Sequence, residues 1–69
     1  MSINIALIGA SKKSVPIIES ILQLKNLHIV GIVENRKNMP GLKLAKKNDI
    51  PVFSTEKELF KLPNINAVI

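Results

Sequence analysis

A turn rich in small and basic residues follows the first apolar run of the chain and reads Gly9-Ala10-Ser11-Lys12-Lys13-Ser14. Glycine allows a tight turn, and the free N–H groups at the start of a following helix bind anions. Serine hydroxyls can donate to phosphate oxygens, and the two lysines bring positive charge to the same place. These residue types are compatible with a phosphate-binding turn, and equally with a basic strand-to-helix connection that binds nothing.

An acidic side chain, Glu34, directly follows the second apolar run and stands 25 residues after Gly9. This is close to the offset of about 20 residues at which a carboxylate accepts hydrogen bonds from the ribose hydroxyls of adenosine. Asn35 and Arg36 come next, and the Arg36 guanidinium could instead neutralise a 2′-phosphate. The turn and the acid together favour a site for NAD or NADP over the alternative that Glu34 is an ordinary loop residue without a ligand. They leave the choice between the two cofactors open.

Other chemistry finds little support in the sequence. The chain has no cysteine and one histidine, so we predict no metal site and assign no catalytic residue. The formal charge of +5 favours anionic partners. The sequence does not favour nucleic acid as a partner, because single-strand binding needs stacking aromatics and both aromatic residues, Phe53 and Phe60, occupy positions typical of a core. Without a long apolar run, the chain is expected to be cytoplasmic and away from membranes.

Apolar runs alternate with stretches of helical periodicity along the whole chain. We predict strands at residues 3–8, 28–33, 50–53 and 67–69, and helices at residues 13–25, 40–47 and 56–62. Gly9 ends the first strand, Pro40 opens the second helix, and Thr55 with Glu58 fits a capping box in which each side chain bonds the other residue's backbone N–H.

This β-α-β-α-β-α-β order predicts an α/β protein with a parallel sheet. Right-handed crossovers place helices on both faces and give the strand order 3-2-1-4 of a half-Rossmann unit. We expect residues 1–69 to form a single nucleotide-binding module that is truncated just after its fourth strand begins. The apolar edge of that strand predicts self-association, or packing against the remainder of a longer protein.

Three stretches of the sequence resemble one known family. "INIALIGASKKS", "LHIVGIVENR" and "LAKKNDIPVFSTEKELFKLPNINAVI" are similar to the N-terminal NAD(P)-binding segment of the glucose-fructose oxidoreductase and inositol dehydrogenase family. The resemblance implies NAD(P) bound across Gly9 to Ser14, with Glu34 at the ribose, in an NAD(P)-dependent oxidoreductase. Ser11 and Ser14 stand where the family has its second and third turn glycines. The family's catalytic lysine and histidine have no counterpart in this chain.

Two further resemblances give alternative functions. "MPGLKLAKKNDIP" is similar to Rossmann-like segments at the front of some bacterial signalling proteins. It implies a regulatory module that senses a ligand or has lost its cofactor. "IGASKK" is similar to the first turn of the CoA-binding domains of acyl-CoA synthetases, which makes a CoA-binding domain the second alternative.

Overall fold

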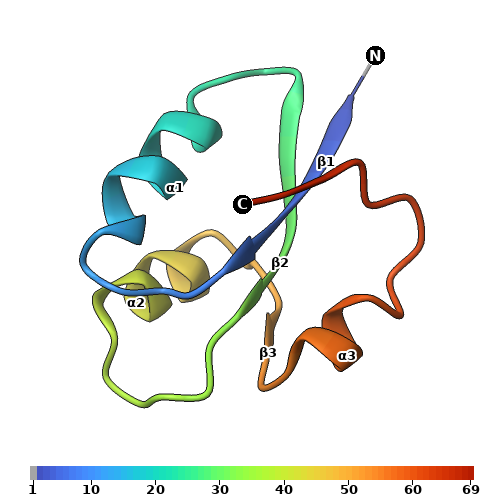
Figure 1. The fold of residues 1–69 in the computed structure, drawn as a ribbon. Helices are drawn as coiled ribbons and strands as arrows, with labels where there is room; N and C mark the ends of the chain where they lie inside the picture. The colour runs from blue at the N-terminus through green and yellow to red at the C-terminus, as the bar shows by residue number, and fades with distance from the viewer. Residues whose placement is uncertain (1) are drawn as a thin grey trace.

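A four-stranded parallel sheet forms the centre of the protein, with the strands in the order β3-β2-β1-β4 (Figure 1). The computed structural model describes residues 2–69. Its elements, in chain order, are β1 (Ile3–Ile8), α1 (Ser14–Leu22), β2 (Leu27–Val33), α2 (Pro40–Lys47), β3 (Val52–Phe53), α3 (Glu56–Leu59) and β4 (Ala67–Val68). The α/β half-Rossmann-like fold and the strand order 3-2-1-4 are thereby confirmed.

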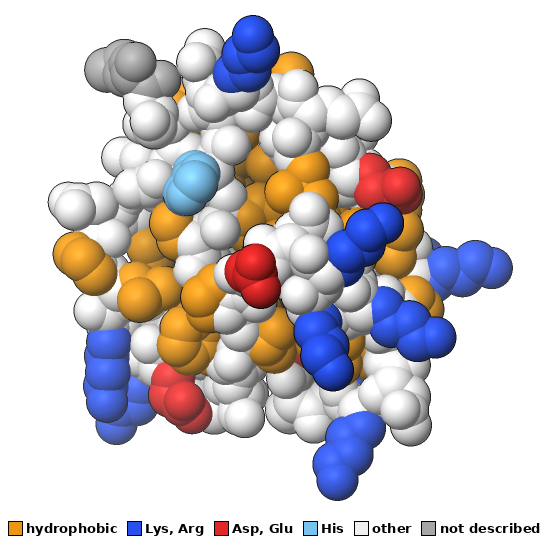
Figure 2. Space-filling view, turned by 180° about the vertical axis from the view of Figure 1, so that it is seen from behind, with side chains coloured by type: hydrophobic (Ala, Val, Ile, Leu, Met, Phe, Trp, Pro, Cys, Tyr) orange, Lys and Arg blue, Asp and Glu red, His pale blue; other side chains and the backbone are white. Residues whose placement is uncertain are grey.

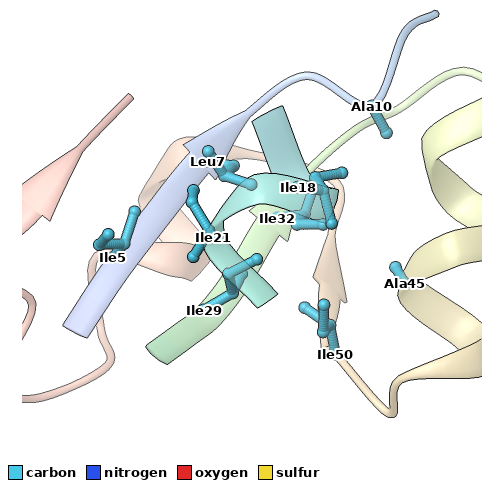
Figure 3. Packing of buried hydrophobic residues seen from close by; sticks show 9 residues of the cluster. All are labelled: Ile5, Leu7, Ala10, Ile18, Ile21, Ile29, Ile32, Ala45 and Ile50. Atoms are coloured by element: carbon cyan, nitrogen blue, oxygen red, sulfur yellow. The ribbon is translucent and has the colours of Figure 1, made fainter. Parts of the chain in front are cut away.

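The helices cover the two faces of the sheet unequally, with α1 and α2 on one side and α3 on the other (Figure 1). The alternation of side chains along β1 explains the two cores, since Ile5 and Leu7 face α1 whereas Ala6 faces α3. Figure 3 shows the larger cluster, which consists of Ile5, Leu7, Ala10, Ile18, Ile21, Ile29, Ile32, Ala45 and Ile50. The smaller cluster contains Ala6, Val33 and Leu59.

Gly31 of β2 allows α3 to lie close against the sheet. A Cβ atom at this position would stand 2.6 Å from Leu59 Cδ1 and 2.8 Å from Phe53 Cε2. The side chain of Leu59 is fully buried in the space that the missing Cβ leaves. A short helix of four residues can therefore close the second face of the sheet.

Two helices end earlier than the apolar periodicity predicts. α1 stops at Leu22, and Leu24, which the prediction placed within the helix at residues 13–25, is 54% exposed in the turn that leads to β2. α3 stops at Leu59, and Phe60 is 54% exposed, so its predicted place in the core is wrong. Beyond these points the backbone hydrogen bonds join residues three positions apart instead of four, as from Leu62 N to Leu59 O at 3.0 Å. The chain must turn back to the sheet here, and this requirement overrides helical periodicity.

The predicted cap of α3 forms in part. Thr55 Oγ1 accepts a hydrogen bond from the Glu58 backbone N–H at 3.3 Å, as a capping box requires. The Glu58 carboxylate, in contrast, accepts from the Thr55 hydroxyl at 3.5 Å rather than from the Thr55 backbone N–H.

Asp49 gives a first stability prediction. It follows α2 with a left-handed φ of 55°, where glycine is the favoured residue, and its carboxylate lies near the negative end of the helix dipole. We expect Asp49→Gly to raise the free energy of unfolding by about 0.5 kcal/mol, measured by urea unfolding. Asp49→Asn removes only the charge and should give a smaller gain. A destabilised Asp49→Gly variant would contradict this account.

Candidate nucleotide-binding crevice

A crevice of about 350 Å³ lies at the carboxyl ends of β1, β2 and β3. In an open parallel sheet the carboxyl ends of the strands are the usual place for a ligand. The lining residues are the last residues of β1 and β2, residues of the segments that follow β1, β2 and β3, and the first residue of α3. They are Ile8, Gly9, Val33, Glu34, Asn35, Arg36, Ser54, Thr55 and Glu56.

The turn after β1 is held by hydrogen bonds from both of its sides. Gly9, with a φ of 97°, donates its N–H to Val33 O at 2.7 Å, and the next N–H, of Ala10, goes to Glu34 Oε1 at 2.9 Å. The Ala10 carbonyl accepts from the Gly41 N–H at 2.8 Å. Ala10 is fully buried. The turn therefore has its shape fixed before any ligand arrives.

Gly41 allows the start of α2 to approach this turn. A Cβ atom on Gly41 would stand 2.7 Å from Ala10 O and 2.9 Å from both Ala10 C and Ala10 Cα. All three are backbone atoms, which cannot rotate away as a side chain can. Glycine in a first helical turn usually weakens a helix, and here the close approach explains its presence.

The second half of the turn leaves backbone donors free. Ser14 donates its N–H to Ser11 O at 2.9 Å, and Lys13 caps α1 without a side-chain hydrogen bond. Among residues 2–69, no acceptor is found for the N–H groups of Ser11, Lys12 and Lys13. Both lysine side chains are exposed. This arrangement can accept an anion at the positive end of the α1 dipole.

The Glu34 carboxylate is buried, with only 3% of its side chain exposed, and it accepts four hydrogen bonds. Oε1 accepts from Ala10 N at 2.9 Å and from Arg36 Nη2 at 3.1 Å. Oε2 accepts from Arg36 N at 3.1 Å and from Arg36 Nε at 2.9 Å. A carboxylate offers about four acceptor positions, so all of them are filled by the protein itself.

These contacts hold the pKa of Glu34 well below its ordinary value, at about 2. The hydrogen bonds from the Arg36 side chain contribute most, followed by the bond from Ala10, and both outweigh the opposing effect of burial. The same pair raises the pKa of Arg36. Glu34 is thus ionised throughout the physiological range.

The depressed pKa predicts how stability depends on pH. Between about pH 2 and 4.5 the unfolded chain holds a proton on Glu34 that the folded protein does not, so the contribution of Glu34 is complete above pH 4.5 and is lost as the pH falls toward 2. Urea unfolding at pH 7, 4.5 and 3 should show most of this loss between the last two values. Glu34→Gln should have a flatter profile over that range, and an unchanged profile would exclude Glu34 as the source.

The structure brings together some of the predicted site residues and separates others. Gly9, Glu34, Asn35 and Arg36 line the crevice, whereas Ala10, within the turn after β1, is fully buried and does not line it. Ser11, Lys12, Lys13 and Ser14 form the turn at the start of α1 and are not part of the lining. The Ser14 hydroxyl lies over the turn, 4.0 Å from where a Cβ on Gly9 would stand.

The crevice also contains residues that the sequence analysis did not propose, namely Ser54, Thr55 and Glu56. They follow β3, which pairs with β2, and therefore reach the same edge as Glu34. The predicted strand order contained this signal, because neighbouring parallel strands end side by side. The carboxylate of Glu56 adds a second negative charge to the lining of the crevice.

A second hollow, of about 340 Å³, lies at the opposite end of β2, and polar groups make up the larger part of its lining. Figure 2 shows hydrophobic surface around the exposed histidine, His28, which lines this hollow together with Asp49 and Leu24. It has neither a glycine turn nor a buried acid, so it is the weaker candidate for a nucleotide. Within residues 2–69 no group of three metal-ligating side chains occurs.

Comparison with known proteins adds no assignment. No family model, curated protein or solved structure matches this chain. The resemblance to the glucose-fructose oxidoreductase family therefore stays a prediction. None of the described helices has the length and apolar character needed to cross a membrane.

Proposed function

We propose that this protein is a nucleotide-binding module that takes NAD or NADP at the carboxyl ends of β1 and β2. The observation that carries the proposal is the position of the crevice. It lies at the carboxyl ends of the strands of a 3-2-1-4 parallel sheet, and both Gly9 and Glu34 line it. The adenosine would occupy this crevice. We assign no catalytic residue to the chain.

The phosphates of the ligand have a separate place in this proposal. The N–H groups of residues 11–13 have no acceptor within the described part of the protein, and Lys12 and Lys13 add two positive charges beside them. Serine at positions 11 and 14 leaves a ligand phosphate less room to approach the backbone than glycine would, but it supplies hydroxyl donors. The turn is also held rigidly through Ala10, so little conformational entropy is lost when an anion binds.

One observation favours a second candidate, a regulatory module that keeps the fold without the cofactor. The protein's own groups fill every acceptor position of Glu34, the residue that would otherwise bind the ribose. In such a module the Glu34 carboxylate would serve only to hold the turn after β1. Both candidates predict the same fold, and they differ in whether a nucleotide binds.

Isothermal titration calorimetry with NAD, NADP, FAD and CoA separates the candidates. The proposal predicts saturable binding of NAD or NADP, whereas preferential binding of CoA would support a CoA-binding domain. Lys12→Glu combined with Lys13→Glu should weaken NAD by about tenfold or more, because two attractive charges become repulsive. Lys47→Glu, on the last turn of α2, has the same kind of charge change and should have little effect. No heat of binding with any of the four ligands would favour the cofactor-free module.

We also propose that the β4 edge supports self-association. β4 pairs with β1 on one side, and Val68 and Ile69 are 48% and 53% exposed. An unpaired strand edge with apolar side chains can pair with a second copy. Light scattering should therefore show a molar mass that rises with concentration, and Val68→Lys should reduce this rise. A monomer at all concentrations would contradict the proposal.

A further inference from the structure

The guanidinium of Arg36 lies where a ligand of Glu34 would have to bind. It donates to Glu34 through Nε at 2.9 Å and Nη2 at 3.1 Å, and it lines the crevice together with that carboxylate. The Arg36 side chain is 61% exposed, whereas that of Glu34 is 3% exposed. The arginine is therefore the movable member of the pair.

The acceptor positions of Glu34 divide into two kinds. Two are taken by backbone N–H groups, those of Ala10 and Arg36, and belong to the fold. The other two are taken by the Arg36 side chain, which can rotate into solvent without disturbing the backbone. Removing the guanidinium thus opens one position on each carboxylate oxygen, the number that two neighbouring hydroxyl groups would need.

We propose that Arg36 is an internal competitor for the ribose site: its guanidinium occupies the two acceptor positions of Glu34 that the vicinal hydroxyls of a ribonucleoside would use. This inference rests on the proposed nucleotide function and concerns the same crevice. Ligand binding then requires the guanidinium to leave Glu34. A phosphorylated ligand offers the displaced cation a new partner, whereas a neutral nucleoside offers none. Arg36 consequently selects against nucleosides and in favour of nucleotides.

The test compares adenosine with 2′,3′-dideoxyadenosine, which lacks both hydroxyls, on the wild type and on Arg36→Met. We expect Arg36→Met to bind adenosine about three- to tenfold more tightly than the wild type, which corresponds to the release of one partly exposed ion pair. Affinity for dideoxyadenosine should be the same in both proteins. Lys47→Met removes an equal charge far from the crevice and should leave both affinities unchanged.

The outcomes distinguish this inference from the proposal on which it rests. If NAD binds the wild type but Arg36→Met gains no affinity for adenosine, or gains equally for dideoxyadenosine, the competitor role of Arg36 is overturned and nucleotide binding stands. If neither NAD nor adenosine binds any of the proteins, both proposals fall. A second readout is the NMR signal of Arg36 Nε–H, which should move away from its position in the Glu34-bound state when NAD, whose adenosine ribose keeps both hydroxyls, saturates the wild type. An unshifted signal at saturation would also overturn the competitor role.

Discussion

Gly41→Ala should lower the free energy of unfolding by about 2 kcal/mol or more and should displace the turn after β1. The new Cβ would stand 2.7 Å from Ala10 O, and the three nearest atoms all belong to the backbone of Ala10. Overpacking of this kind usually costs about 1–3 kcal/mol, and the better helix propensity of alanine returns less than about 1 kcal/mol. Urea unfolding gives the loss, and the amide signals of Gly9 and Ala10 report the displacement.

Gly31→Ala is the matched control for this prediction. Its Cβ would meet Leu59 Cδ1 and Phe53 Cε2, which are the ends of side chains on the α3 face of the sheet. The amides of the turn after β1 should keep their positions in this variant, whatever its stability. A Gly41→Ala protein with wild-type stability and unmoved turn signals would show that α2 does not hold the turn.

The second large effect is expected at Glu34. Glu34→Ala removes the acceptor of the buried Ala10 N–H and all the bonds to Arg36, so we expect a loss of about 3 kcal/mol at pH 7. A loss of this size is a large part of the total stability of about 3–10 kcal/mol that a chain of this length can have. Urea unfolding at pH 7 measures it.

Glu34→Gln separates the two interactions of the carboxylate, which are the hydrogen bond from Ala10 and the ion pair with Arg36. The amide oxygen can still accept from Ala10 N–H, whereas the amide nitrogen faces the Arg36 guanidinium as a second donor. We expect a smaller loss than in Glu34→Ala, with the turn amides close to their wild-type positions. Equal stability of the alanine variant and the wild type would contradict a role for Glu34 in holding the turn.

The same substitution bears on ligand binding. Glu34→Ala should weaken NAD if the carboxylate meets the ribose, and it would also weaken NAD if the turn merely lost its shape. The glutamine variant resolves this, because it retains the bond to Ala10 but has one carboxylate acceptor fewer for the hydroxyls. Weaker NAD binding in Glu34→Gln, with undisturbed turn amides, would assign the ribose contact to Glu34.

The main elements of the fold could be predicted because local signals coincide with their boundaries. β1 begins and ends where predicted, since Gly9 stops an apolar run, and α2 has the predicted bounds because Pro40 opens it. The parallel sheet followed from the alternation of strands and helices. The early end of α1 was missed because Leu24 continues the apolar period, although it lies in a connecting turn.

The residues of the candidate site could be predicted, but the hydrogen bonds that connect them could not. The offset from Gly9 to Glu34 indicated that both reach one edge of the sheet. Nothing local shows that Glu34 bonds Ala10, since this contact joins residues 24 positions apart and depends on the register of β1 and β2. The Ala10–Gly41 contact likewise joins residues that are far apart in the sequence, so local patterns do not show it. A glycine directly after a helix-opening proline was nevertheless a sign that another part of the backbone packs closely there.

The most direct test of the central claim is an NMR titration of the uniformly ¹⁵N-labelled protein with NAD. The amides of Ser11, Lys12 and Lys13, for which residues 2–69 provide no acceptor, should move saturably as the phosphates reach them. Those of Gly9 and Ala10, already bonded to Val33 and Glu34, should move much less. Unmoved signals for residues 11–13 at millimolar NAD and NADP, in a protein with an intact spectrum, would contradict nucleotide binding at this turn.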